Sequence, residues 1–393
     1  MPKPTAGRQR GFKRRAALLV LLLFVALGLA AGSWGQTTNP DPLAVLGYNE
    51  LGMHCMNQDF SEICILPPYN TLRAEIIDRS GSEPRIITSG VTVRYAIPSN
   101  TRSADKTNFW LFAKQLFGVD LAPNLGLTGN GLAGTLRLTS RSDWEATGIP
   151  ITPVNDFGQD DPYPLAQITV IRNGVMAGQT RTVVPVSSEI SCNLCHSGAS
   201  VADDILRKHD RLHNTRLQQA KPVLCASCHA DPALSAPGQA GVSSLSHAMH
   251  RAHAERVADL RLDNSCYACH PGFRAQCQRD VHLSNGVTCT TCHGDMLAVA
   301  NTNRRPWIDE PRCSSCHQRS GFQFEETGKL YKESRGHEGV TCAACHGAPH
   351  AITPTATEAD NLQAINYQNH PGKLDQCTVC HRQRPNETFP HRR

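Results

Sequence analysis

The chain has 393 residues and a formal net charge of +5. Hydrophobic residues make up 40% of it and charged residues 19%, a balance that excludes a disordered chain and a membrane protein with many spans. The 17 cysteines and 18 histidines are unusual, because all but two cysteines and one histidine lie after residue 191. The sequence therefore predicts an ordinary front half joined to a back half that is loaded with a metal or a cofactor.

Residues 1–35 have the layout of a secretory signal. Six basic residues precede an apolar run from Ala16 to Ala31, and small residues follow it. We expect this segment to be removed; the alternative is an uncleaved anchor, because residues 16–35 are just long enough to span a bilayer. Without the six cations, 33 basic residues (39 less six) stand against 34 acidic ones. The basic charge is then a targeting feature and does not indicate a nucleic-acid partner.

Residues 36–190 are expected to form a β-rich, sandwich-like domain. Alternating residues predict strands at 91–95, 166–170 and 180–184, and Asn173-Gly174 predicts a hairpin turn between the last two. Further strand candidates are residues 71–78 and 134–139, and residues 105–117 are expected to form a helix that stops at Gly118.

The front half has one concentrated group of reactive side chains, Met53-His54-Cys55-Met56, with Cys64 close behind it. In an oxidising compartment, Cys55 and Cys64 are a possible disulfide that closes a short loop. Two alternatives remain open: His54 or Met56 as a ligand from this module to a metal of the back half, and a copper site, since sulfur and imidazole suit copper.

The back half carries seven Cys-x-x-Cys-His motifs. In chain order they are Cys192-Cys195-His196, Cys225-Cys228-His229, Cys266-Cys269-His270, Cys289-Cys292-His293, Cys313-Cys316-His317, Cys342-Cys345-His346 and Cys377-Cys380-His381. This is the attachment signature of c-type haem: each thiol bonds one vinyl group, and the adjacent histidine is the proximal iron ligand. Zinc sites and redox dithiols do not require a histidine directly after every second cysteine.

With these motifs, residues 191–393 resemble the multihaem c-type cytochromes of bacterial periplasm and cell surface. The resemblance covers about half the chain and implies seven haems c. The fold class is then mixed: a β-rich domain at 36–190, followed by a mostly helical and irregular heptahaem cytochrome c domain at 191–393. Only 202 residues, from 192 to 393, serve seven haems, so the porphyrins are expected to supply much of the apolar core.

Eleven histidines lie outside the motifs and are candidates for the distal position on each iron. The preferred ones are His209, His213, His247, His250, His282, His337, His350 and His370. His253 is held in reserve on the same predicted helix as His247 and His250, and His391 is expected to be frayed. Cys277 has no motif partner, and its role stays open.

Three classes of function remain. The first is an electron carrier of the periplasm or cell surface, with mainly bis-histidine haems and with other cytochromes or a membrane quinol-linked complex as redox partners. The second is an oxidoreductase that acts on nitrite, hydroxylamine or tetrathionate at one open haem. The third is a structural role, in which subunits assemble through contacts between haems. We favour the first, because histidines outnumber the ligands that seven irons need; contact with a membrane is expected only if the signal segment stays uncleaved.

Overall fold

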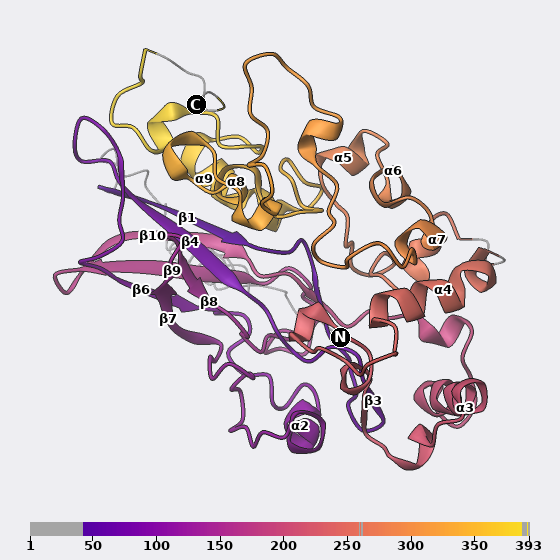
Figure 1. The fold of residues 1–393 in the computed structure, drawn as a ribbon. Helices are drawn as coiled ribbons and strands as arrows, with labels where there is room; N and C mark the ends of the chain where they lie inside the picture. The colour runs from indigo at the N-terminus through magenta and orange to yellow at the C-terminus, as the bar shows by residue number, and fades with distance from the viewer. Residues whose placement is uncertain (1–41, 259, 261, 387–390, 392–393) are drawn as a thin grey trace, which may run out of the picture. The chain divides into compact units, whose positions relative to one another are not determined.

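The structure is a computed structural model that describes residues 42–258, 260, 262–386 and 391 (Figure 1). The predicted signal segment at 1–35 lies outside these residues. Asp41–Arg393 form one compact unit. Within the described ranges, no helix has the length and apolar character needed to cross a membrane.

The front half is built on an eight-stranded antiparallel sheet with the order β1-β4-β8-β7-β6-β9-β10, in which β5 also pairs with β4. The strands are β1 (Leu43–Asn49), β4 (Leu72–Asp78), β5 (Arg85–Ile86), β6 (Thr92–Ala96), β7 (Ala133–Leu138), β8 (Trp144–Ala146), β9 (Leu165–Arg172) and β10 (Val175–Val183). Short parallel pairs join β2 (His54–Cys55) to β11 (Val186–Ser187) and β3 (Ile63–Cys64) to β12 (Val223–Leu224).

This sheet curls back on itself, so that its first strand packs against its last two. A Cβ atom on Gly47 of β1 would lie 2.8 Å from Ile168 and 2.9 Å from Thr182, and one on Gly178 of β10 would lie 3.0 Å from Val45. A larger residue at either position would crowd these side chains, so glycine lets the first and last strands pack closely. The nearly closed sheet encloses an apolar core, and the β-rich front half and the mixed fold class are both confirmed.

The predicted strands and hairpin of the front half are present. The hairpin turn between β9 and β10 has both Asn173 and Gly174 at positive φ, as the Asn-Gly pair predicts. The helix α2 (Phe109–Phe117) stops at Gly118 as expected, but it begins later than residue 105. The side chain of Asn108 accepts a hydrogen bond from the amide of Phe60 and donates one to Asp59, so it fastens a neighbouring loop where the helix starts.

The back half, residues 191–393, has short helices joined by irregular chain, as the sequence predicts. Its α-helices are α3 (Val201–His213), α4 (Leu245–Ala258), α5 (Val281–Ser284), α6 (Cys289–His293), α7 (Met296–Val299), α8 (Cys342–His346) and α9 (Glu358–Gln368). Single 3-10 turns lie at Cys192–Leu194, Leu217–Gln219, Cys225–Ser227, Pro232–Leu234, Ser265–Ala268, Cys313–Ser315, Tyr331–Glu333, His337–Gly339 and Cys377–Val379.

Helix α9 covers the outer edge of β1 and joins the two halves. The hydroxyl of Tyr367 accepts from the amide of Val45 at 2.8 Å and donates to the Val45 carbonyl at 2.9 Å. Gln363 accepts from the amide of Gly47 at 2.7 Å. These side chains satisfy backbone groups of β1 that a further strand would otherwise pair with.

Candidate functional site

Each Cys-x-x-Cys-His motif of the back half folds into one tight turn. Five lie on 3-10 turns, and the fourth and sixth lie on α6 and α8. In the first motif, for example, the amide of His196 donates to the carbonyl of Cys192 at 2.9 Å, and His381 and Cys377 of the last motif do the same at 2.8 Å. One turn thus gathers two thiols and an imidazole from five consecutive residues, which is the arrangement that covalent haem attachment requires.

Each motif histidine lies opposite a second imidazole that comes from elsewhere in the chain. We number the sites 1–7 after the motifs. The ring centroids are separated by 6.3 Å in His196–His253, 6.3 Å in His229–His209, 6.2 Å in His270–His250, 5.9 Å in His293–His350, 6.1 Å in His317–His282, 5.8 Å in His346–His391 and 6.0 Å in His381–His337.

These separations fit two imidazoles on opposite sides of one iron. An imidazole nitrogen binds a metal at about 2 Å and lies roughly 1 Å from its own ring centroid, so two axial ligands have centroids about 6 Å apart. All seven pairs fall between 5.8 and 6.3 Å. The residues present therefore fit a haem iron with two histidine ligands at every motif.

Hydrogen bonds at Nδ1 fix which ring nitrogen is free to bind iron. Nδ1 of His229, His250, His253 and His391 lies 2.7–2.9 Å from a backbone carbonyl oxygen. A carbonyl oxygen can only accept, so Nδ1 carries the proton and Nε2 keeps its lone pair for a metal. Carboxylates fill the same position at two further rings, where Asp204 lies 3.1 Å from His196 and Asp280 lies 2.9 Å from His282.

Three of the motif histidines favour the neutral form. Burial and, to a smaller extent, neighbouring imidazoles lower the pKa of His270, His293 and His346 to about 4 each. A neutral imidazole is the form that binds a metal.

Four histidines considered from the sequence lie outside these pairs. Nε2 of His247 lies 3.0 Å from the carbonyl of Arg304, so this nitrogen carries a proton and has no lone pair to give. His370 uses Nδ1 toward the Pro371 carbonyl, and its Nε2 is 3.5 Å from Asp375. The ring of His213 lies beside that of His209, with the centroids 4.8 Å apart and the planes tilted by 51°.

The fourth, His54, is buried in the front module. Its Nε2 lies 3.1 Å from the side-chain oxygen of Asn49, and burial lowers its pKa to about 4. Met56 is 2% exposed inside the core of the sheet. Within the described residues, no cluster of three or more His, Cys, Asp or Glu side chains is arranged to hold a bare metal ion.

Two histidines that the sequence ranked low lie opposite motif histidines. His253 belongs to α4, one turn after His250, and its selection over His247 depends on the neighbouring chain at Arg304. His391 is held by Gln323, whose amide donates to the His391 carbonyl and whose carbonyl accepts from Nδ1. The i, i+3 spacing on α4 was a usable signal for His253; His391 offered none.

A buried carboxylate fastens the end of the front module to the third motif. Glu189 is 5% exposed and accepts from four successive backbone amides, those of residues 272–275, at 2.6–3.2 Å. Burial alone would raise its pKa, but these four donors outweigh burial and hold the pKa below its usual value. Glu189 thus fixes the loop that directly follows His270.

A buried arginine fixes the distal histidine of site 4. Arg279 is 1% exposed and forms a two-pronged ion pair with Asp360 of α9 at 2.6 and 2.8 Å. Its side chain also donates to the Gly52 carbonyl, and its backbone amide donates to the His350 carbonyl at 2.9 Å. The front module, α9 and a candidate iron ligand therefore meet at one side chain.

The three cysteines outside the motifs are free thiols in this structure. Cys55 lies on β2, which pairs with β11, and Cys64 lies on β3, which pairs with β12. No bond joins Cys55 to Cys64 in this structure, and their disulfide stays a prediction. Cys277 lies in the segment between Glu189's loop and Arg279, and its amide donates to the Pro271 carbonyl.

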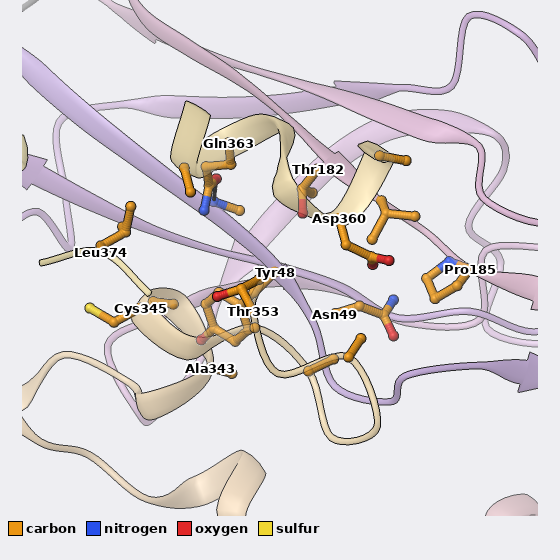
Figure 2. Close-up of a pocket in the computed structure, with 18 of the residues that line it drawn as sticks. Tyr48, Asn49, Thr182, Pro185, Ala343, Cys345, Thr353, Asp360, Gln363 and Leu374 are labelled. Atoms are coloured by element: carbon orange, nitrogen blue, oxygen red, sulfur yellow. Dashed lines mark hydrogen bonds between the residues drawn. The ribbon is translucent and has the colours of Figure 1, made fainter. Parts of the chain in front are cut away.

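A small cavity lies between β1, α8 and α9, lined in part by Tyr48, Thr182, Asp360 and Gln363 (Figure 2). Its volume is about 40 Å³. A water molecule needs roughly 10–15 Å³ measured in this way, so the cavity has room for a few waters and not for an organic substrate.

Comparison with known proteins agrees with the site geometry. Residues 298–347, which carry the fifth and sixth motifs, match the family described as cytochrome c554 and c-prime. This match supports a c-type cytochrome with haem as its cofactor and a haem-based role in electron transfer.

Two further comparisons add little. No curated protein matches the chain. Among solved structures, the chain is similar to a Pseudomonas fluorescens alkylpurine DNA glycosylase bound to DNA with an abasic-site analogue, at 11% identity over 36% of this chain and 30% of that one. The TM-score of 0.15 is too low for any conclusion about fold.

Proposed function

We propose that this chain is an exported electron carrier with seven covalently bound haems c, each held by two histidines. One observation carries the proposal: every motif histidine has a second imidazole opposite it at the separation that a shared iron requires. Bound haem supplies the one-electron chemistry, and the protein supplies ligands, orientation and burial.

The ligand set favours electron transfer over catalysis. A haem enzyme of the kind considered above needs an iron that can exchange water for substrate, whereas two imidazoles fill both axial positions. Neutral histidine pairs without methionine also favour low reduction potentials, because a methionine ligand raises the potential. The redox partners are then other exported cytochromes or a membrane quinol-linked complex.

Export is part of the proposal. The basic and apolar start of the chain is typical of a secretory signal. Haem is normally attached to such motifs outside the cytoplasm, so the signal and the motifs favour the same compartment, the periplasm or the cell surface.

Low-temperature EPR of the oxidised protein tests the ligand set, because it counts low-spin and high-spin irons together. The expected result is seven low-spin ferric haems and no high-spin signal, with little binding of carbon monoxide by the reduced protein. A native high-spin haem together with turnover of nitrite, hydroxylamine or tetrathionate would replace the electron carrier with the oxidoreductase.

A further inference from the structure

The contacts between sites point to an order that we infer to be the path of electrons: the seven sites form one unbranched row, 2-1-3-4-5-6-7, along which electrons pass from neighbour to neighbour. The ends are the pairs His209–His229 and His337–His381. This inference rests on the proposed function and goes beyond it, because motif order alone would place site 1 at an end.

Sites 2 and 1 share helix α3. Asp204 on this helix accepts from Nδ1 of His196, the motif histidine of site 1, at 3.1 Å. His209, just over one turn later on the same helix, lies opposite His229 of site 2. One rigid helix therefore contacts the ligands of both sites.

Sites 1 and 3 share helix α4. His253 lies opposite His196 of site 1, and His250 lies opposite His270 of site 3. Residues three apart on a helix project about 60° from each other and are separated by about 4.5 Å along the axis. Two sites whose ligands are this close on one helix are direct neighbours.

Sites 3 and 4 are bridged by Asn264. Its side-chain oxygen accepts from the amide of Cys266 at 3.0 Å, and its side-chain nitrogen donates to the sulfur of Cys289 at 3.2 Å. These are the first cysteines of the third and fourth motifs, so the two attachment points lie within the reach of one short side chain.

Sites 4 and 5 are joined through consecutive residues. The amide of Arg279 donates to the carbonyl of His350, the distal histidine of site 4. The next residue, Asp280, accepts from Nδ1 of His282, the distal histidine of site 5, at 2.9 Å. A two-residue segment thus orients one ligand of each site.

Sites 5 and 6 are joined by an aromatic ring. The ring of Phe324 lies 5.9 Å from that of His317, the motif histidine of site 5, and 6.2 Å from that of His391. His391 in turn lies opposite His346 of site 6 at 5.8 Å.

Sites 6 and 7 lie against the same face of β1. Ala344, between the two cysteines of the sixth motif, and Val379, between those of the seventh, belong to one buried cluster with Leu46 and Tyr48. The amide of Leu374 also donates to the carbonyl of Cys345 at 2.9 Å, which ties the approach to the seventh motif directly to the sixth.

Figure 1 shows the same course, with α3 and α9 at opposite ends of the back half of the chain and α4 between them.

The row is tested by counting the haems that lie next to site 2 and next to site 1. His209→Gly and His253→Gly each remove one distal ligand and should each create one high-spin ferric iron, which broadens and shifts the haem-methyl proton NMR signals of adjacent haems. We expect His209→Gly to perturb the methyl signals of one other haem and His253→Gly those of two. Two perturbed haems for His209→Gly, as direct contact between sites 2 and 3 would give, or one for His253→Gly, overturns the row.

The milder variants His209→Met and His253→Met repeat the test if the glycine variants fail to fold. A methionine ligand raises the potential of its own site, so the first electron added goes there and changes the signals of its neighbours. We again expect His209→Met to perturb the signals of one other haem and His253→Met those of two. Two perturbed haems for His209→Met, or one for His253→Met, overturns the row. His213→Gly, the control, should create no high-spin iron. If the histidine variants change no spin state at all, the proposed ligation fails, which is a different result from a wrong count.

Discussion

Gly52 of the front module touches His350, the distal histidine of site 4. A Cβ atom on Gly52 would lie 3.0 Å from the Cβ of His350 and only 2.0 Å from the carbonyl oxygen of Pro349. Glycine is therefore needed at residue 52, where the front half supports a candidate iron ligand. The residue just before Met53-His54-Cys55-Met56 thus has a structural role that neither a copper site nor a disulfide would explain.

Gly52→Ala should displace His350 and weaken axial ligation at site 4. Overpacking of this kind costs about 1–3 kcal/mol of stability. We expect one of the seven ferric irons to gain high-spin character, as measured by EPR of the oxidised protein. Gly131→Ala is the matched control, because its Cβ would meet only ordinary contacts at 3.5 Å or more. An unchanged spin state in Gly52→Ala would contradict the contact.

Glu189→Gln should destabilise the protein at neutral pH and much less in acid. Hydrogen bonds to a charged group contribute about 1.5–3 kcal/mol each, and the variant weakens four of them, so we expect a loss of at least about 2 kcal/mol. Because the folded-state pKa of Glu189 is lowered, its contribution is present above the unfolded pKa of about 4.3 and is lost as the pH falls through the folded value.

Thermal unfolding from pH 7 to pH 3 measures this difference. The gap in midpoint between the wild type and Glu189→Gln should be widest above about pH 5 and should narrow below about pH 4. Glu83→Gln changes an exposed carboxylate and should leave the midpoint unchanged at every pH. A constant gap across the range would mean that the charge of Glu189 is not what holds the loop.

Replacement of His391 by methionine should raise one of the seven reduction potentials, because methionine in place of histidine favours the ferrous state. A spectroelectrochemical titration resolves this as one reduction step that moves to higher potential. His247→Met and His370→Met should move no step, because neither side chain lies opposite a motif histidine. A shift in either control, or none in His391→Met, would reassign the distal ligand.

Loss of the seventh motif should reduce the haem count by one and loosen the front module. The wild-type mass should equal that of the mature chain plus seven haems, and Cys377→Ser with Cys380→Ser should lack one. Val379 packs with Ala344 and Tyr48 of β1, so we also expect a lower unfolding midpoint. Mass spectrometry under denaturing conditions and a pyridine haemochrome assay give the counts; five or fewer haems in mature wild-type protein would contradict the assignment.

Local spacing predicted the attachment residues and the strand pairs, because each depends on a few consecutive residues. The Asn173-Gly174 turn and the stop at Gly118 are of this kind, since both need positive φ. The distal ligands are different, because each meets its motif histidine only when distant segments pack together. On α4, three histidines are equally good candidates for a distal ligand when only the local sequence is considered. The structure distinguishes them, because Nε2 of His247 bonds to the carbonyl of Arg304.

The closure of the sheet was also beyond sequence reasoning. Strand β1 is buried along its whole length, so it lacks the alternation that marks a half-exposed strand. Its covering comes from α9 and the sixth and seventh motifs, which lie at the other end of the chain. No pattern within residues 43–49 shows what packs against them.

Because α9 covers the edge of β1, this edge is completed only late in the folding of the chain. Synthesis runs from the amino end, so β1 is made long before Gln363 and Tyr367, the residues that occupy its open edge. An uncovered edge strand is a template on which another chain can pair. The nascent chain therefore has an unpaired edge strand until α9 docks. A chain that stalls before that point is prone to aggregation and to proteolysis.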